Sequence, residues 1–477
     1  MIGLSNIAYN ADIDEIKAFI NAYPYVSTDV SFRKCKEYLT EPTDEEYLNN
    51  RADCIASSLD TDDVLKTALG KASTKCSGEE CSDCPINKYC NHYINLRRSL
   101  VNSDSLKMID LFCGAGGLSL GFTQEGFITA LANDIEPCCI DTYSHNHPET
   151  KRDRIILGDI KQLVDNVEEY TKGQKISVIV GGPPCQGFSM ANRQRIIDDP
   201  RNKLYRNYVE IVNKVQPPFF VMENVKGMLS VANQVIEDFE AIGYKTSAKV
   251  LNARDFGVPQ NRERLVYVGN RIGVDNNHIF DEIEEYSRTI KGYVLGDALF
   301  GLPPLSASRT KNNTEVSDDG SGKKISSYIG ETNDYISLIN QGRTIKVLCN
   351  HKARYNNDRD IEIFSRLNPG DNSNDPKIAD IMPYARRYDI FKDKYYKLDS
   401  SKISKTITAH MKFDCNMYIH PDQARGLTPR EAARIQSYPD DYFFRGAYTK
   451  TYMQIGNSVP PLLGRAIATV LRKYIKE

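Results

Sequence analysis

Short apolar runs that alternate with helical segments constrain the fold of this 477-residue sequence more than any other feature. Stretches such as 204–215 and 234–242 have helical character and lie between runs of strand length. This alternation is typical of βαβ units, which build a mostly parallel sheet with helices on both faces. The predicted strands are 106–112, 127–133, 154–157, 176–180, 219–223, 246–251 and 265–269. We therefore expect an open, doubly wound α/β sheet, whose ligands bind at the carboxyl ends of the strands.

The segments on either side of this alternation differ from it. Residues 1–104 predict a helical N-terminal extension, because apolar residues recur at helical spacing in 12–20 and again after Thr43. Residues 275–424 are rich in Asn, Asp, Ser, Lys and Tyr and predict a smaller inserted domain. The regular pattern returns at 425 and ends in a helix from about Pro461. The predicted domains are 1–104, 105–274, 275–424 and 425–477.

Charge and hydropathy restrict the function only weakly. The net charge is −2, so a DNA-binding face would have to be a local basic patch. The basic groups of 351–354, Arg386-Arg387 and 402–405 are candidates for contacts with phosphates. No run reaches the roughly 18 apolar residues of a membrane span, and no secretory signal is visible. We therefore expect a cytoplasmic protein.

A glycine-rich loop follows the first predicted strand, in Asp110-Leu-Phe-Cys-Gly-Ala-Gly-Gly-Leu-Ser-Leu-Gly-Phe122. Glycines there permit a tight turn and let a ligand approach the backbone N–H groups of a helix N-terminus. Asp134 ends the next strand, where an acid can bond ribose hydroxyls, and Asp159 follows the third. A purely structural turn is the alternative for the loop alone, but the three strand ends together favour a nucleoside pocket.

Cys185 lies in Gly181-Gly-Pro-Pro-Cys-Gln-Gly-Phe-Ser189, directly after the fourth predicted strand. The prolines stiffen this loop and present the thiol at the ligand edge of the sheet. A cysteine can form a covalent intermediate when it reacts as the thiolate. A buried, inert cysteine is the alternative, but turn-forming residues surround Cys185, which favours a reactive thiol.

Two further elements carry charged groups to the same edge. Glu223, in Phe219-Phe-Val-Met-Glu-Asn-Val225, ends an apolar strand, where a carboxylate needs a partner if it is buried. Arg262 and Arg264 alternate in Pro259-Gln-Asn-Arg-Glu-Arg264 and could grip a phosphate or carboxylate together. A solvent-exposed Glu223 and a surface ion-pair cluster are the alternatives.

In this order, the motifs resemble those of the DNA (cytosine-5) methyltransferase family. The resemblance runs from about Lys107 to the C-terminus, outside the insert. It covers the glycine-rich loop, the loop Gly181–Ser189 that holds Cys185 (here called the Pro-Cys loop), Glu223-Asn-Val225 and Gln260-x-Arg-x-Arg264. Three more matching blocks are Arg201-Asn-Lys-Leu-Tyr205, Leu427-Thr-Pro-Arg-Glu-Ala-Ala-Arg-Ile-Gln-Ser-Tyr-Pro439 and Gln454-Ile-Gly-Asn-Ser-Val-Pro-Pro461.

The resemblance implies a methyltransferase that uses S-adenosylmethionine and a flipped-out cytosine in duplex DNA. Cys185 would attack carbon 6, Glu223 would contact the N3/N4 edge, and Arg264 would assist. The insert would be the target-recognition domain, and its sequence does not reveal the target. The implied DNA contacts are Gln186, Arg201 and Arg262. The implied cofactor residues are Phe112, Gly114, Gly116, Gly117, Asp134, Ile135, Asp159, Ile160, Pro183, Leu204 and Asn457.

Ile135 departs from the aromatic residue that the family often has in that position. The chain is otherwise expected to be an active monomeric enzyme, with a cognate restriction endonuclease acting on the same site. An RNA cytosine-5 methyltransferase and a non-catalytic DNA-binding homologue are the alternatives. Intact Cys185, Glu223 and Arg264 argue against a protein that only binds, and the long insert favours duplex DNA over RNA.

Four cysteines are clustered in the N-terminal extension, at Cys76, Cys81, Cys84 and Cys90. A disulfide framework is not expected in a cytosolic chain. The last three resemble the iron–sulfur loop of endonuclease III-type glycosylases, although the first spacing is shorter here. Four thiolates also suit tetrahedral zinc. We expect a metal site, with a [4Fe–4S] cluster favoured over zinc, and four unligated thiols are the alternative.

Overall fold

The computed structural model describes residues 105–147, 150–184, 203–311, 320–328, 330–342, 345, 347–383 and 394–475. Several predictions therefore lie outside the described residues. They are the N-terminal helices, the four clustered cysteines, Cys185, Gln186, Arg201 and the Arg386-Arg387 pair. In the part of the chain that is described, no helix is long and apolar enough to cross a membrane.

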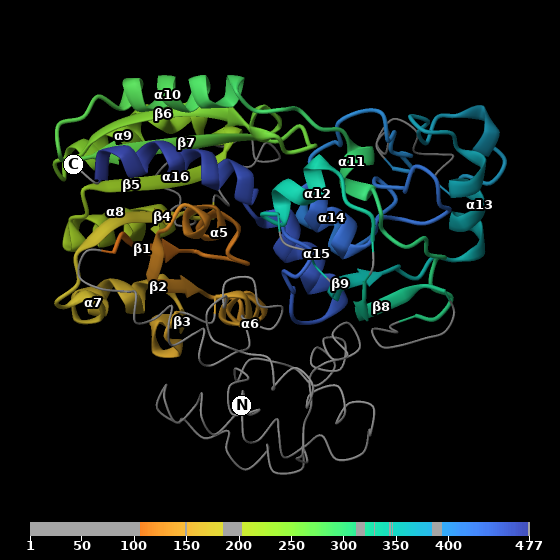
Figure 1. The fold of residues 1–477 in the computed structure, drawn as a ribbon, viewed down its shortest axis with the longest axis horizontal. Helices are drawn as coiled ribbons and strands as arrows, with labels where there is room; N and C mark the ends of the chain where they lie inside the picture. The colour runs from red at the N-terminus through yellow and green to blue at the C-terminus, as the bar shows by residue number, and fades with distance from the viewer. Residues whose placement is uncertain are drawn as a thin grey trace, which may run out of the picture.

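A seven-stranded sheet forms the centre of the larger lobe (Figure 1). Its order is β3-β2-β1-β4-β5-β7-β6, with β3, β2, β1, β4 and β5 parallel and β7 antiparallel to both of its neighbours. The prediction of a mostly parallel sheet is confirmed. The strands are β1 (Lys107–Leu111), β2 (Ile128–Asp134), β3 (Ile155–Leu157), β4 (Ile176–Gly181), β5 (Phe219–Val225), β6 (Lys245–Asn252) and β7 (Glu263–Asn270).

Helices cover both faces of this sheet, because side chains alternate along each strand. Met108 of β1 belongs to a core cluster with α5 (Gly117–Gln124), α10 (Asn276–Arg288) and α16 (Pro461–Ile475). Ile109, the next residue, packs in a second cluster on the opposite face. The helices of that second cluster are α7 (Ile160–Thr171), α8 (Lys203–Val215) and α9 (Ala232–Glu240). The sheet is therefore doubly wound, as predicted.

The remaining elements of this lobe connect the strands. They are α6 (Pro137–Asn146) and the 3-10 turns η5 (Arg152–Arg154), η7 (Lys226–Val231) and η8 (Ala253–Phe256). Helix α10 lies beyond the predicted boundary at 274, yet Ile279, Phe280 and Ile283 are buried in the core cluster that contains Met108, here called the sheet-side core. The layer that covers the sheet therefore extends into the segment predicted as the insert.

A smaller lobe lies beside the sheet, on the right in Figure 1. It has a two-stranded antiparallel sheet of β8 (Gly322–Ser327) and β9 (Val347–Lys352). Its helices are α11 (Leu295–Leu299), α12 (Asp334–Ile339), α13 (Asp358–Arg366), α14 (Pro429–Ile435) and α15 (Tyr448–Asn457), with turns η9 (Pro376–Ile378) and η10 (Ala409–Lys412). The first core cluster continues from the sheet through α16 into α14 and α15, so the lobes share a hydrophobic core.

Candidate active site and cofactor pocket

The carboxyl ends of five parallel strands meet at one edge of the sheet and carry the predicted site residues. Register places Leu111 of β1 beside both Asn133 of β2 and Gly181 of β4. Gly181 in turn pairs with Met222 of β5, one residue before Glu223. The predicted residues after β1, β2, β3 and β4, and Glu223 of β5, therefore lie along the same edge, where open α/β sheets bind ligands.

The glycine-rich loop is fastened to the end of β2 by a carboxylate. Gly114 N–H donates to Asp134 Oδ2 at 2.8 Å, and Glu136 N–H donates to Asp134 Oδ1 at 2.8 Å. Burial raises the pKa of the Asp134 carboxyl above its usual value, although both backbone bonds act against this. Each oxygen keeps a lone pair after accepting one bond, so the carboxylate can still accept from ligand hydroxyls.

The same loop has a left-handed backbone that only small residues adopt easily. Gly114 has φ +53°, and a Cβ there would meet no atom within 4 Å. Gly116, with φ 79°, is the N-cap of α5. The open space at Gly114 and the free N–H groups that begin α5 form a cradle for a polar ligand.

The C-terminal segment packs directly behind this loop. A Cβ on Gly117 would lie 2.3 Å from the carbonyl oxygen of Val459 and 2.4 Å from the Tyr438 hydroxyl. The Tyr442 hydroxyl donates to the Ala115 carbonyl at 2.5 Å. Asn457, which is exposed, precedes Val459 by two residues and so lies near the loop. The first and last motif blocks therefore meet at this loop.

Apolar surface at the ends of β2 and β3 completes the pocket edge. Ile135, which follows β2, is 67% exposed, and Leu157, which ends β3, is 51% exposed. Asp159 is the N-cap of α7 and accepts from Lys161 N–H. Ile160 is placed differently from the other predicted pocket residues, because its side chain is buried in the core beneath α7. Only its backbone is available to a ligand.

These residues fit the adenosyl group of S-adenosylmethionine. Exposed aliphatic side chains at Ile135 and Leu157 suit an adenine ring, and the Asp134 carboxylate suits the ribose hydroxyls. The open cradle at Gly114 leaves room for a polar chain. The remaining predicted positions, Phe112, Pro183 and Leu204, stand near the ends of β1 and β4 and at the start of α8.

Glu223 and Arg264 form an ion pair at the end of β5. Arg264 Nε lies 2.7 Å from Glu223 Oε1, and the two side chains are only 14% and 12% exposed. Their strands are antiparallel neighbours, with Val225 opposite Arg264. The exposed-Glu alternative is therefore wrong, because Glu223 is mostly buried and has a cationic partner. Arg264 fixes the carboxylate at the edge of the sheet.

The start of the Pro-Cys loop lies against this ion pair. A Cβ on Gly182 would come within 2.9 Å of Glu223 Oε2. Asn224 Nδ2 donates to the Pro183 carbonyl at 2.8 Å, and both residues are buried. The segment that leads to Cys185 is therefore tied to the strand that carries Glu223.

The comparison with protein families agrees with this geometry. The family model of C-5 cytosine-specific DNA methylases matches residues 106–473. The chain belongs to this family. It is a DNA cytosine-5 methyltransferase with the α/β fold of S-adenosylmethionine-dependent methyltransferases.

Relatives cover most of this methyltransferase. The type II methyltransferase M1.HphI of Haemophilus parahaemolyticus is 36% identical over 395 residues, which are 81% of this chain and 91% of that protein. M.AgeI of Thalassovita gelatinovora, also a type II methyltransferase, is 32% identical and covers 78% of this chain and 100% of its own. A crystal structure of a protein encoded within an E. coli prophage, and assigned as a DNA modification methyltransferase, superposes with TM-score 0.62 and 25% identity, over 78% of this chain and all of that one.

Arg262 corrects one prediction for this methyltransferase. Its side chain is completely buried and donates to the carbonyl oxygens of Ile407 at 2.7 Å, Gly456 at 3.0 Å and Ser458 at 2.7 Å. The prediction that Arg262 contacts DNA is therefore wrong, because other segments of the protein enclose the guanidinium. Arg262 instead joins the start of β7 to two distant segments.

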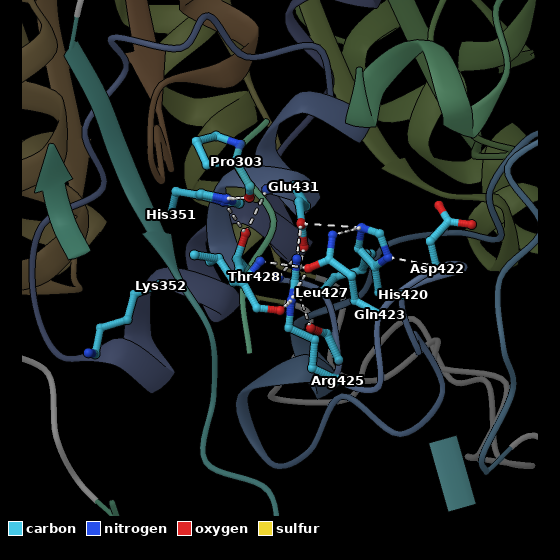
Figure 2. Close-up of polar contacts among 12 residues, drawn as sticks. Pro303, His351, Lys352, His420, Asp422, Gln423, Arg425, Leu427, Thr428 and Glu431 are labelled. Carbon is cyan, nitrogen blue, oxygen red and sulfur yellow. Dashed lines mark hydrogen bonds and ion pairs between the residues drawn. The ribbon is translucent and has the colours of Figure 1, made fainter. Parts of the chain in front are cut away.

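Sequence reasoning missed a buried polar cluster in the smaller lobe of the methyltransferase (Figure 2). Arg425 donates to both oxygens of Glu431 at 2.9 and 2.6 Å, and both side chains are 1% exposed. Although burial alone would raise it, the neighbouring Arg425 holds the pKa of the Glu431 carboxyl below its usual value. Glu431 also accepts from Thr428 N–H, closing the capping box of α14.

This cluster also holds strand β9 of the smaller lobe. One ring nitrogen of His351 lies 3.1 Å from the Thr428 hydroxyl and the other lies 2.9 Å from the Pro303 carbonyl oxygen. Burial lowers the pKa of His351 to about 4. His420 approaches Glu431 at 3.6 Å from the other side, as Figure 2 shows. The charged residues of the 427–439 block are visible in the sequence, but their burial is not.

Proposed function

We propose that this methyltransferase methylates carbon 5 of a flipped-out cytosine in a specific duplex DNA sequence through a covalent adduct with Cys185. The observation that carries the proposal is the Glu223–Arg264 pair, which adjoins both Gly182 of the Pro-Cys loop and the edge that holds the cofactor loop. A nucleophile loop, a paired carboxylate and a nucleoside pocket on one sheet edge are the parts that this reaction needs.

The thiolate of Cys185 attacks carbon 6 of the cytosine and forms a C–S bond, which makes carbon 5 nucleophilic. Glu223 has Oε1 on Arg264, and its Oε2 has no bonded partner among the described residues. Oε2 is therefore free to hydrogen-bond the N3/N4 edge, which stabilises the electron shift into the ring. When bound, S-adenosylmethionine supplies the methyl group. Loss of the proton from carbon 5 then expels Cys185 and restores the ring.

The proposed pocket assigns Asp134 to the ribose hydroxyls, Ile135 to the adenine face and Asp159 to the adenine edge. Phe112, Gly114, Gly116 and Gly117 would follow the methionine portion. Their support is the bonding of Asp134 to Gly114 and the exposure of Ile135. Gln186 and Arg201 remain proposed DNA contacts, and the smaller lobe the proposed target-recognition domain, since phosphate contacts position and base contacts specify.

DNA that contains 5-fluorocytosine tests the covalent step. Fluorine cannot leave carbon 5 as a cation, so the adduct is trapped and survives denaturing electrophoresis. We expect a trapped complex with wild-type protein and none with Cys185→Ser, while Cys138→Ser, a half-buried thiol on α6, still forms it. Radiolabelled methyl transfer to unmethylated DNA and to RNA is measured in parallel. Label on RNA alone, or no label on either, would overturn the proposal in favour of an RNA enzyme or a non-catalytic homologue.

Glu223→Gln tests the carboxylate separately. Removing a positioned acid or base lowers turnover by roughly 10²–10⁴-fold. We expect this loss in kcat with trapped adduct still forming slowly, because the nucleophile is intact. An unchanged kcat would remove Glu223 from the mechanism.

The relatives' description as type II methyltransferases supports a place in a restriction–modification system, with a cognate endonuclease for the same site. We propose a cytoplasmic monomer, which sedimentation at several concentrations tests. We also propose that Cys76, Cys81, Cys84 and Cys90 hold a metal. Iron, sulfide and zinc analysis of anaerobically purified protein tests this: one zinc without iron would exclude the favoured [4Fe–4S] cluster, and neither metal would exclude the site.

A further inference from the structure

An exposed aromatic side chain projects from the turn at residues 409–413, here called the η10 turn. Phe413 is 63% exposed, and among the described large hydrophobic residues only Ile135 of the cofactor edge is more exposed. Lys412 Nζ lies 4.9 Å from the centre of its ring, and the His410 ring meets it edge-on at 5.4 Å. The tip of the turn is thus an aromatic ring between two groups that can donate to phosphate.

The backbone beneath Phe413 is clamped. Arg354 donates to the carbonyl of Met411 at 2.8 Å and to that of Phe413 at 2.5 Å. Met411 itself is completely buried in the core that α15 shares. The tip is therefore held in one conformation while its side chains reach solvent, and a partner would not have to order it on binding.

The η10 turn lies beside the candidate active site. A Cβ on Gly456 would come within 2.2 Å of Ala409 N, so the end of α15, next to Asn457, packs against the turn. The segment just before the turn is fixed through Ile407, whose carbonyl accepts from Arg262. Arg262 stands two residues before Arg264, the partner of Glu223. The turn is thus anchored to the two segments that carry Asn457 and Arg264.

The charge around the tip suits a polyanion. Among the described residues, no carboxylate pairs with His410 or Lys412, while the nearby Asp414 is neutralised by Lys394 at 3.2 Å. Aromatic rings stack on bases whatever the sequence, and Lys side chains neutralise phosphates. The substrate of this enzyme offers both, because flipping a cytosine unstacks its neighbours.

We propose that Phe413 stacks on a base next to the flipped cytosine, while Lys412 and His410 meet the adjoining phosphates. This inference rests on the proposed function, because it requires a flipped base. Phe413 would replace part of the stacking that the duplex loses, and so would favour the extrahelical state of the target.

The test uses full-length enzyme and a duplex that carries a target site mapped by bisulfite sequencing of treated plasmid. 2-Aminopurine replaces the target cytosine and is paired with thymine in the matched duplex, and its fluorescence rises when it leaves the stack. Phe413→Ala should weaken flipping and duplex binding by about 5- to 150-fold, the effect of losing one base–aromatic stack. Phe413→Tyr should retain both. A mismatch at the target, which lowers the cost of unstacking, should shrink the Phe413→Ala defect.

Matched controls lie at the opposite edge of the sheet. Ile272 follows the end of antiparallel β7 and is 47% exposed, so Ile272→Ala should leave flipping unchanged. Lys412→Ala should reduce the slope of log K against log salt by about 1. Lys172→Ala, after α7 and before β4, should not change it.

The outcomes separate the two proposals. If wild-type enzyme neither methylates nor flips the duplex, the proposed function fails, and this inference with it. If wild type flips the base and Phe413→Ala does so equally well with an unchanged melting temperature, only the inference fails. A Phe413→Ala defect that persists undiminished in the mismatched duplex would also overturn it, since stacking beside the target would then not be the cause.

Discussion

Arg262→Met removes a completely buried cation from the point where the start of β7 meets the C-terminal segments. The guanidinium makes three hydrogen bonds to carbonyl oxygens, and no carboxylate pairs with it among the described residues. Its Nε has no hydrogen-bond partner, and burial lowers the pKa of the group below its usual value. Methionine fills much of the same volume but leaves the carbonyls of Ile407, Gly456 and Ser458 without a donor.

The magnitude follows from two opposing terms. Hydrogen bonds from a charged donor contribute roughly 1.5–3 kcal/mol each, so three amount to about 5–9 kcal/mol. Relief of an incompletely compensated buried charge returns several kcal/mol. We therefore expect a net loss of about 2–4 kcal/mol, and a fall in Tm of roughly 3–5 °C for a domain of about 370 residues.

Thermal melting with and without S-adenosylhomocysteine checks this prediction. Gly456 and Ser458 flank Asn457, so the variant should also lose part of the stabilisation that the ligand gives. Arg271→Met is the matched control, because Arg271 is exposed and its guanidinium donates to the Gln216 side chain at the surface. An unchanged Tm together with a salt slope for DNA binding reduced by about 1 would refute the structural role and restore Arg262 as a phosphate contact.

Three further predictions concern buried polar groups and a close contact. Thr428→Ala removes the N-cap of α14 and a partner of His351, and should cost about 1–2 kcal/mol in urea unfolding; a value near zero would contradict the cap. Because burial lowers the pKa of His351 from 6.5 to about 4, the unfolded chain binds the proton first, and stability is lost as pH falls between those values. His351→Gln should therefore lose less stability than wild type between pH 7 and 5, by up to about 1.4 kcal/mol per pH unit. His278→Gln, at an exposed histidine, should match wild type. Equal losses in all three proteins would exclude a contribution of His351 to the pH dependence of stability. Gly117→Ala should weaken S-adenosylmethionine binding by roughly tenfold or more, about 1.4 kcal/mol by calorimetry, since its Cβ would strike the Val459 carbonyl; unchanged affinity would contradict that contact.

The strands of the sheet were predictable because the local composition of each strand indicates that it is buried. The fourth strand was predicted at 176–180 and is β4, Ile176–Gly181, with every residue buried. A strand covered on both faces must be a continuous apolar run, and glycines or acids mark where it leaves the core. The boundary of the insert was less predictable. Helix α10 has the polar composition of a surface helix, and only its three buried apolar residues assign it to the layer that covers the sheet.

Arg262 and Arg264 show where local reasoning ends. Their spacing predicts that the two side chains point the same way, and nothing in that spacing distinguishes the environment of one arginine from that of the other. Arg264 reaches Glu223 at the edge of the sheet, whereas Arg262 is enclosed by carbonyls that lie 145, 194 and 196 residues later in the chain. Which of two neighbouring arginines is covered depends on those later segments. Spacing along the strand contains no information about them.

The buried cluster around Glu431 extends this argument from one residue to the packing of the smaller lobe. Arg425 and Glu431 offset part of each other's burial through two hydrogen bonds, and a single substitution would leave an uncompensated charge. Through Thr428 the cluster also orients His351, and so β9 of the smaller lobe, against α14, which packs in the sheet-side core. Directional polar contacts of this kind fix the position of β9 on α14 more closely than apolar contacts would.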